Sequence, residues 1–387
     1  MDNRVLFITQ YGVGPPFAGN RSRIQRLLED LRELGFEIHL ADVLMPDHEL
    51  STTLPYVDGH IHRFKNTAHD RSVLARAKRK FRTFGSSWMK KDQNEVSIDR
   101  WFFPHWDTEA VALQKEARYS RVIVEYVFHS RFLKSFGEDC LKILDTHDCF
   151  AHRNARLAAK GATANWFETT TEGERIGLLR ADRIIAIQDL ENDYFRDLVG
   201  GKRDVFTVGH RCVPTPMDLP KQNDTIGYLS SNNPLNVDSL RWFLDEVWPT
   251  ILSRRPHAKL LIAGTICQTH WSAVNVDVIG EVEVLSEFFK KCSLVINPMR
   301  VGTGLKIKTI EALAHGRMVV GTDVAFEGIA DRMHGLDCIA NDPQVFAQHV
   351  LKYLGDLKLL AESSDQAIHV VKGLNQAWKD ALVAVMQ

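Results

Sequence analysis

The sequence lacks a long apolar run. No stretch approaches the roughly 20 residues that a membrane-spanning helix needs, and no basic region with an apolar signal core precedes the first expected strand, Val5–Thr9. The six cysteines are scattered and form no CxxC pair, so they indicate reduced, mostly buried thiols rather than a disulfide framework. We therefore expect a cytoplasmic protein.

An excess of one charge is also missing. The chain has 48 basic and 49 acidic residues, and this balance gives no reason to expect nucleic acid as a partner. A hydrophobic content of 44% and a charged content of 25% are typical of a soluble globular protein. The 387 residues suffice for two or three domains of about 150 residues each.

Short buried strands alternate with amphipathic helices along almost the whole chain, a pattern typical of parallel α/β sheets. A stretch rich in glycine and proline, 207–224, separates two such series and predicts a domain boundary there. We expect two doubly wound, Rossmann-like domains that face a cleft. The predicted divisions are an N-terminal domain (1–208), a connector (209–224), a C-terminal domain (225–370) and a terminal helix that crosses back (371–387).

The most informative segment joins a buried strand that ends at Asn297 to a helix. Between them lies the glycine-rich loop Pro298–Gly304, a place where backbone N–H groups and the helix dipole meet a ligand. Lys306, Lys308 and Glu311 follow at the start of the helix. They suit a sugar nucleotide, whose diphosphate matches the lysines and amides and whose ribose diol matches the carboxylate. An ordinary βα loop with a solvated, charged first turn is the alternative.

Two blocks of the sequence resemble a known family, the GT-B glycosyltransferases related to family 4. Block 298–322 is similar to the donor-binding motif of that family, including its Glu-Ala-Leu-Ala-x-Gly core at Glu311–Gly316. Block 236–249 is similar to the first helix of the C-terminal domain in one bacterial branch. Weaker similarity lies at 12–23 and at 144–148, so the resemblance covers most of the chain and is strongest in its C-terminal half.

The resemblance implies that the C-terminal domain holds a nucleotide-diphosphate sugar and that the N-terminal domain holds a glycan, lipid-linked or small-molecule acceptor. It implies a hexosyltransferase-type enzyme of polysaccharide or glycoconjugate biosynthesis that retains the anomeric configuration. Glu311 would bind the ribose hydroxyls, and Lys306 and Lys308 would approach the phosphates. The donor-binding residues that it implies are Gly302, Thr303, Gly304, Leu305, Lys306, Lys308, Glu311, Val282 and Asn233.

The sequence departs from the family pattern at two places. Thr303 stands where many relatives have a glutamate that contacts the donor sugar. The loop Ser230–Asn233 stands where many have an arginine and a lysine for the phosphates. Two alternatives therefore stay open: a catalytically silent GT-B protein that acts as a binding module, and a nicotinamide-dependent oxidoreductase. The absence of a clean GxGxxG motif counts against the second alternative.

We expect His147 and Lys308 to be the catalytic residues. A departing diphosphate needs charge stabilisation, which Lys308 supplies without a metal; no DxD pair lies on a suitable loop, so we predict no metal and no other cofactor. His147 follows the strand expected at Leu141–Leu144, at the edge where open α/β sheets bind ligands, and imidazole exchanges protons near neutral pH. Asp145 or Asp148 would orient the ring, whereas a hydrogen-bonded loop histidine is the alternative.

Acceptor binding is expected near the N-terminus. Gly14 lets the backbone of the first loop approach a ligand, and Arg21 and Arg23 at the start of the next helix suit an anionic acceptor. The segment 71–91 has eight basic residues and no acidic one, with apolar residues between them. It fits an anionic membrane surface, with the protein at the inner face, or a lipid-diphosphate acceptor. A solvated basic segment is an equally good interpretation.

Overall fold

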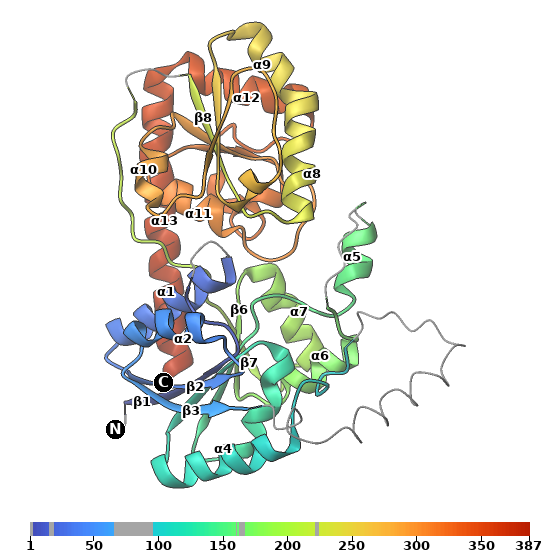
Figure 1. The fold of residues 1–387 in the computed structure, drawn as a ribbon, viewed down its shortest axis with the longest axis vertical. Coiled ribbons are helices and arrows are strands. Elements are labelled where there is room, and N and C mark those ends of the chain that lie inside the picture. Colours follow the sequence, from blue (N-terminus) through green and yellow to red (C-terminus); the bar gives the residue numbers. More distant parts are fainter. Residues whose placement is uncertain (1–2, 15–18, 66–95, 160, 162–166, 221–223) are drawn as a thin grey trace, which may run out of the picture.

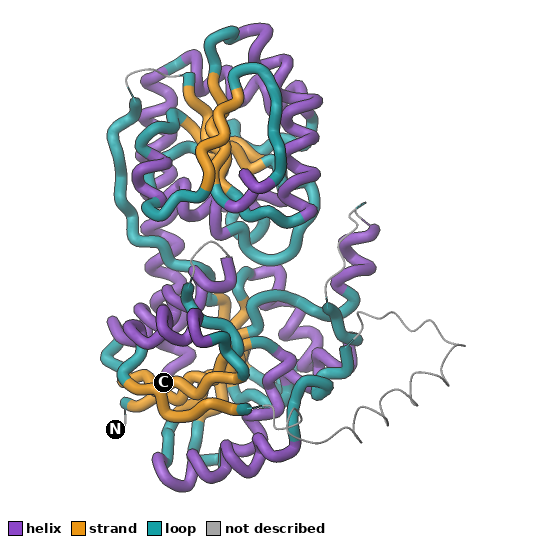
Figure 2. Tube along the Cα trace, viewed as in Figure 1, coloured by secondary structure: helices purple, strands orange, loops and turns teal. Residues whose placement is uncertain are grey.

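The chain forms two α/β domains (Figures 1 and 2), each with helices on both faces of a parallel sheet. The computed structural model describes residues 3–14, 19–65, 96–159, 161, 167–220 and 224–387. The N-terminal sheet has seven strands in the order β3-β2-β1-β4-β5-β6-β7, and the C-terminal sheet has five in the order β10-β9-β8-β11-β12. The doubly wound architecture predicted from the sequence is confirmed.

The strands are short and mostly apolar, as expected for parallel strands that are covered on both faces. The N-terminal sheet contains β1 (Arg4–Thr9), β2 (Glu37–Val43), β3 (Gly59–Phe64), β4 (Arg121–Glu125), β5 (Leu141–Asp145), β6 (Arg183–Ala186) and β7 (Asp204–Thr207). The C-terminal sheet contains β8 (Thr225–Leu229), β9 (Lys259–Ala263), β10 (Val276–Gly280), β11 (Leu294–Asn297) and β12 (Val319–Gly321).

The helices connect these strands and cover the sheets. Those of the N-terminal half are α1 (Gly19–Glu33), α2 (Asp47–Thr53), α4 (Pro104–Ala117), α5 (Arg153–Ala159), α6 (Thr171–Leu178) and α7 (Asp189–Val199). Those of the C-terminal half are α8 (Pro234–Trp242), α9 (Trp248–Arg254), α10 (Leu285–Phe289), α11 (Ile307–Ala314), α12 (Pro343–Gly355) and α13 (Leu357–Met386). None of the helices in these described parts is long and apolar enough to cross a bilayer.

A π-helical turn joins α8 to α9, where the sequence predicts one helix over Asn236–Ser253. The turn covers Phe243–Val247 and stands just before Pro249. Proline has no N–H group, and its ring clashes with the carbonyl of the preceding helical turn. A π-turn in a helix relieves such a conflict locally, so the helix continues across the proline.

The long helix α13 belongs to both domains (Figure 1). Its residue Trp378 packs in the core of the C-terminal domain, whereas Leu382 and Met386 pack with α1 in a core of the N-terminal domain. The connector crosses this helix at Gly209, where a Cβ atom would lie only 2.3 Å from the indole ring of Trp378. A glycine is therefore required for the close approach that joins the two domains.

Aromatic side chains fill the other core of the N-terminal domain. Phe102 and Trp106 are buried, and the Trp106 ring stacks on Phe132 with ring centroids 5.6 Å apart. Burial of these large rings stabilises the face of the sheet that α4 covers. The aromatic segment Trp101–Trp106 therefore serves the core.

Candidate active site

A cavity of about 940 Å³ lies between the two domains. Residues that follow the carboxyl ends of strands in both sheets line it, among them Tyr126 after β4, His147 after β5 and Ser230 after β8. Ligands of open α/β sheets bind at this edge. We call this cavity the cleft.

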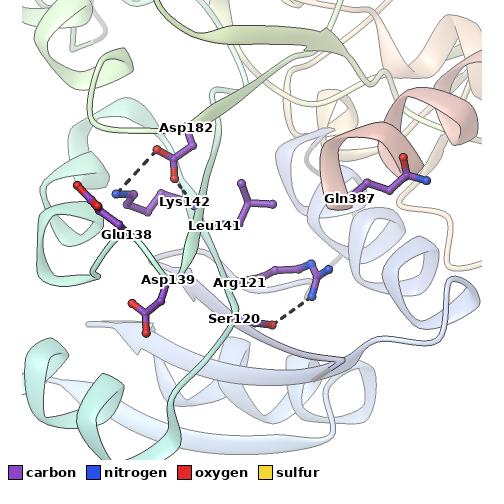
Figure 3. A pocket seen from close by; sticks show the side chains of 8 residues that line it. All are labelled: Ser120, Arg121, Glu138, Asp139, Leu141, Lys142, Asp182 and Gln387. Carbon is purple, nitrogen blue, oxygen red and sulfur yellow. Dashed lines mark hydrogen bonds and ion pairs between the residues drawn. The ribbon is translucent and has the colours of Figure 1, made fainter. Parts of the chain in front are cut away.

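A second hollow, of about 590 Å³, lies at the opposite edge of the N-terminal sheet (Figure 3). It is open and lined by residues at the amino ends of β4 and β5. Lys142 pairs there with Asp182 at 3.8 Å, and Arg121 donates to the carbonyl oxygen of Met386 at 2.8 Å. Three of its charged side chains, those of Arg121, Lys142 and Asp182, are engaged in contacts within the protein, so the cleft is the better candidate for a ligand site.

The glycine-rich loop and the start of α11 form the C-terminal wall of the cleft. Lys306 is 6% exposed, and its Nζ donates to the carbonyl oxygens of Gly304 at 2.5 Å and of Thr303 at 3.4 Å. The same ammonium group pairs with Glu327 at 3.1 Å. Lys306 therefore holds the shape of the loop.

Two glycines let this loop pack closely. A Cβ atom at Gly302 would lie 2.9 Å from Met299 Sδ, so a side chain there would push the Met299 side chain aside. Gly304 has a φ angle of +71° and lies opposite the carbonyl oxygen of His147, which a Cβ atom would approach to 3.8 Å. Thr303, Gly304 and Leu305 line the cleft.

Lys308 and Glu311 lie one turn apart on α11 and both line the cleft. The Lys308 ammonium donates to Ser230 Oγ at 3.0 Å and to Asn236 Oδ1 at 2.9 Å. Burial, with repulsion from Lys306, lowers the pKa of Lys308 to about 7. Burial raises the pKa of Glu311 to about 7.

The Glu311 carboxylate forms no hydrogen bond with any residue that the structure describes. Lys308 and Glu311 are therefore each held in a site that disfavours the charged form, and a ligand of complementary chemistry would relieve that cost. Perturbed titrating groups in a cleft are typical of functional sites.

The other predicted donor residues surround α11. Asn233 caps α8, because its side-chain oxygen accepts from the backbone N–H of Asn236 at 2.9 Å. Asn233 and Val282 line the cleft. The loop of Ser230 that lacks basic residues is also the loop that Lys308 contacts, so a cation reaches it from α11 instead.

His147 stands on the N-terminal wall in an unusual backbone conformation. His147 and Tyr126 have φ angles of +63° and +64°, and their rings stack with centroids 4.2 Å apart and planes 9° apart. A left-handed conformation costs a residue with a side chain about 1–2 kcal/mol and concentrates at functional sites. The structure therefore supports a special role for this pair.

Buried charged groups lie behind His147. Its Nε2 atom pairs with the carboxylate of Glu125, and Asp145 Oδ2 lies 3.5 Å from the same nitrogen. Burial raises the pKa of Glu125, while the neighbouring His147 opposes this shift. Glu125 was not predicted from the sequence, although a carboxylate at the end of the apolar strand β4 is a signal that indicates such a residue.

Arg23 and Arg21, predicted to bind an acceptor, are engaged inside the protein. Arg23 donates to both oxygens of Asp145, at 2.5 and 3.1 Å, and to the carbonyl oxygen of Val208 at 3.0 Å. Arg21 pairs with Glu49 at 2.6 Å and donates to the carbonyl oxygen of Gly14. The cleft includes Arg23, but Arg21 and Gly14 are not among its described lining residues. An acceptor role for these three residues stays a prediction.

Within the described part of the chain, Glu125, Asp145 and His147 form one group with the spacing of metal ligands, their atoms lying within 4.8 Å of one another. The guanidinium of Arg23 occupies both oxygens of Asp145 and places a positive charge beside the group. These contacts fit an internal charge network better than a divalent cation. The basic segment 71–91 lies outside the described residues, and membrane contact through it stays a prediction.

Polar contacts join the two walls at Thr303. Its hydroxyl donates to Asp148 Oδ2 at 2.7 Å and accepts from Arg153 at 3.3 Å. Arg153 also pairs with Asp148 at 2.7 Å. Arg153 was not predicted from the sequence. The residue that departs from the family pattern therefore contacts the opposite domain.

Comparisons with known structures show that this architecture is the GT-B fold. Sucrose-phosphate synthase from Thermosynechococcus elongatus is similar over 99% of this chain and 98% of its own, with a TM-score of 0.67 and 14% identity. The pneumococcal O-GlcNAc transferase GtfA, in complex with UDP and GlcNAc, is similar over 100% of both chains, with a TM-score of 0.67 and 11% identity. Anabaena HepE, in complex with UDP and glucose, covers 98% of this chain and 99% of its own, with a TM-score of 0.62 and 12% identity.

Sequence comparisons point in the same direction. The family model "Glycosyl transferases group 1" matches residues 223–356, which include the whole C-terminal wall of the cleft. An uncharacterized 44.6 kDa protein in the cps region of Klebsiella pneumoniae is 28% identical over 151 residues, which are 36% of this chain and 39% of that protein. The chain thus resembles GT-B glycosyltransferases, and the match to group 1 supports a function in sugar transfer.

Proposed function

We propose that this protein is a hexosyltransferase-type enzyme that moves a sugar from a nucleotide-diphosphate sugar to a glycan, lipid-linked or small-molecule acceptor. One observation carries this proposal. Lys308 and Glu311, a cation and a carboxylate that are both half-buried, lie together near the start of α11, and desolvation moves the pKa of each to about 7.

The chemistry of a sugar nucleotide matches these two groups. A diphosphate beside Lys308 restores the charged form of the lysine, and the backbone amides at the start of α11 add further donors. A ribose diol supplies two hydroxyl donors to the Glu311 carboxylate, which lies one turn further along the helix. A single ligand would then relieve both burial penalties, and this relief would contribute to its affinity.

We propose a uridine nucleotide as the first donor to test. Val282 and Glu283 line the cleft beyond α11, where the base of such a ligand would lie. Among the proteins of similar fold, HepE and GtfA were both determined with UDP. That shared ligand makes UDP the natural starting point, while the base in this protein stays a proposal.

We propose that Lys308 stabilises the departing diphosphate without a metal ion and that the anomeric configuration is retained. Charge stabilisation of a leaving group by a preorganised cation is among the larger contributions to catalysis. The contacts among Thr303, Asp148 and Arg153 close the cleft at one point. Such closure excludes water and holds acceptor and donor together.

Ligand-induced stabilisation tests the proposal. The purified protein would be heated with UDP, GDP, ADP, dTDP or NAD(H); a ligand at a hundred times its Kd adds about 2.7 kcal/mol of stability. We expect one nucleoside diphosphate to stabilise the wild type and not to stabilise Glu311→Ala. Glu362→Ala is the matched control, because Glu362 is exposed on α13. Stabilisation by NAD(H) alone, or by none of these ligands, would contradict the proposal.

A second assay separates an enzyme from a binding module. Release of UDP from UDP-glucose or UDP-GlcNAc would be followed in the presence of the wild type and of Lys308→Ala. An enzyme transfers the sugar to water, or to a hydroxyl of an added acceptor glycan, and so releases UDP; Lys308→Ala slows that release. Binding of UDP without release from either donor would favour a catalytically silent GT-B protein.

A further inference from the structure

The carboxylate of Glu125 has no part in the donor site, yet it lies against His147. Glu125 is completely buried, and its Oε2 atom is paired with His147 Nε2. Burying a carboxylate is costly unless a partner balances its charge or shares a proton with it. The structure therefore holds this carboxylate at an unfavourable place, and His147 is the partner that compensates it.

Asp145 cannot take the place of Glu125 as the main partner of the ring. Its Oδ2 atom lies 3.5 Å from His147 Nε2, beyond an ordinary hydrogen bond. Arg23 donates to both oxygens of Asp145, so the charges of these two groups balance each other. Glu125 and His147 are left to share one proton between Oε2 and Nε2.

The side chain of His147 lines the cleft, and its ring has a second nitrogen besides Nε2. This atom, Nδ1, forms no hydrogen bond with the residues that the structure describes. Stacking on Tyr126 and the left-handed backbone of both residues fix the orientation of the ring. An imidazole whose Nε2 carries the proton has a lone pair on Nδ1, and that nitrogen then only accepts hydrogen bonds.

We propose that Glu125 is a positioning residue, which accepts a hydrogen bond from His147 Nε2–H and so presents Nδ1 to the cleft as an acceptor for a sugar hydroxyl. The identity of the ligand rests on the proposed function, whereas the state of the ring does not. The N-terminal wall then selects a ligand with a hydroxyl donor at this position.

The tautomer of His147 tests this inference directly. Nitrogen chemical shifts of histidine-labelled protein distinguish Nε2–H from Nδ1–H, and His147→Asn identifies the signal. We expect the Nε2–H tautomer in the wild type and in Glu125→Asp. The amide of Glu125→Gln can instead donate to Nε2, so this variant should populate the Nδ1–H form.

Glu174→Gln is the matched control. Glu174 is also a buried carboxylate of the N-terminal domain, but it accepts from the backbone N–H groups of Phe150 and Ala151. This variant should leave the His147 tautomer unchanged. A wild-type His147 that is Nδ1–H or doubly protonated at pH 8 would overturn the inference.

A kinetic readout separates positioning from a loss of fold. Glu125→Gln should keep the stabilisation by UDP, because α11 is intact, and should slow UDP release from a donor sugar at least tenfold; Glu125→Asp should recover part of the rate. Loss of UDP binding in Glu125→Gln would indicate a merely structural role and overturn the inference. If the wild type releases no UDP, the proposed function fails, whereas the tautomer of His147 still tests whether Glu125 positions the ring.

Discussion

The two walls of the cleft hold their charges in opposite ways. On the N-terminal wall, Arg23 pairs with Asp145 and Arg153 with Asp148, so the charges of these two pairs are balanced within the protein. On the C-terminal wall, burial shifts the pKa of both Lys308 and Glu311 to about 7. The first wall is preorganised without a ligand, whereas the second carries a cost that a ligand can relieve.

This contrast has a thermodynamic consequence. Removing one partner of a balanced buried pair leaves an uncompensated charge and destabilises the fold. A charge that burial already disfavours has the opposite effect: its removal stabilises the fold and damages only ligand binding. Such an exchange of stability for function is common. Whether a substitution lowers or raises the free energy of unfolding therefore distinguishes the two walls.

The largest expected effect is on the N-terminal wall. Arg23→Met removes the partner of Asp145, which is 0% exposed, and should lower the free energy of unfolding by about 3–5 kcal/mol. Urea denaturation followed by circular dichroism measures this change. The double variant Arg23→Met/Asp145→Leu should recover most of the loss, because neither charge remains. A loss below about 1 kcal/mol in the single variant would show that the pair is not balanced as described.

The opposite sign is expected on the C-terminal wall. Lys308→Met should raise the free energy of unfolding of the empty protein by about 1–2 kcal/mol at pH 7, because it removes an ammonium that burial disfavours. The same variant should lose stabilisation by UDP. Lys352→Met is the control, since Lys352 is exposed and pairs with Asp337 at the surface. A destabilised Lys308→Met would contradict the distinction between the walls.

The arrangement of the C-terminal wall is more predictable from the sequence than that of the N-terminal wall, and the reason is geometric. Lys306, Lys308 and Glu311 lie together on one loop and helix, so their spacing alone predicts a shared site. Arg23 and Asp145 are 122 residues apart along the chain, and no local pattern links them. An arginine at a helix start predicts an anionic acceptor, and nothing in the local sequence indicates that its guanidinium also pairs with Asp145.

The fold shows the same division between local and distant information. Buried strands such as β1 and β11 were predictable because apolar residues fill them. The edge strand β7 was missed, since its residues are only partly buried and its short sequence has no apolar run. The π-turn at Phe243–Val247 was also missed, because it is a response of a packed helix to Pro249.

The pH dependence of stability sharpens the comparison within the C-terminal wall. The pKa of Lys308 is lowered from 10.5 to about 7, so its cost is full below pH 7 and disappears as the pH rises towards 10.5. The pKa of Glu311 is raised from 4.5 to about 7, so its cost is full above pH 7 and disappears as the pH falls towards 4.5.

Two variants should therefore show opposite trends. The stability gained by Lys308→Met should be greater at about pH 6 than at about pH 9, and the gain by Glu311→Gln should be greater at about pH 8 than at about pH 5. Thermal unfolding in a series of buffers of equal ionic strength measures both trends. Parallel pH trends in the two variants would show that the titration belongs to other groups.

The smallest expected effect is at Thr303, where the two walls touch. Thr303→Ala removes the hydrogen bond to Asp148 and should cost only about 0.5–1 kcal/mol, because Asp148 keeps its ion pair with Arg153. Thr303→Ser retains the hydroxyl and should retain most of the stability. Since Lys308 and Glu311 are untouched, stabilisation by UDP should be preserved in both variants. If Thr303→Ala instead abolished the stabilisation by UDP, the donor site would depend on the contact between the domains. The two walls would then act as one cooperative unit, and the distinction between a preorganised N-terminal wall and a C-terminal wall that a ligand stabilises would not hold.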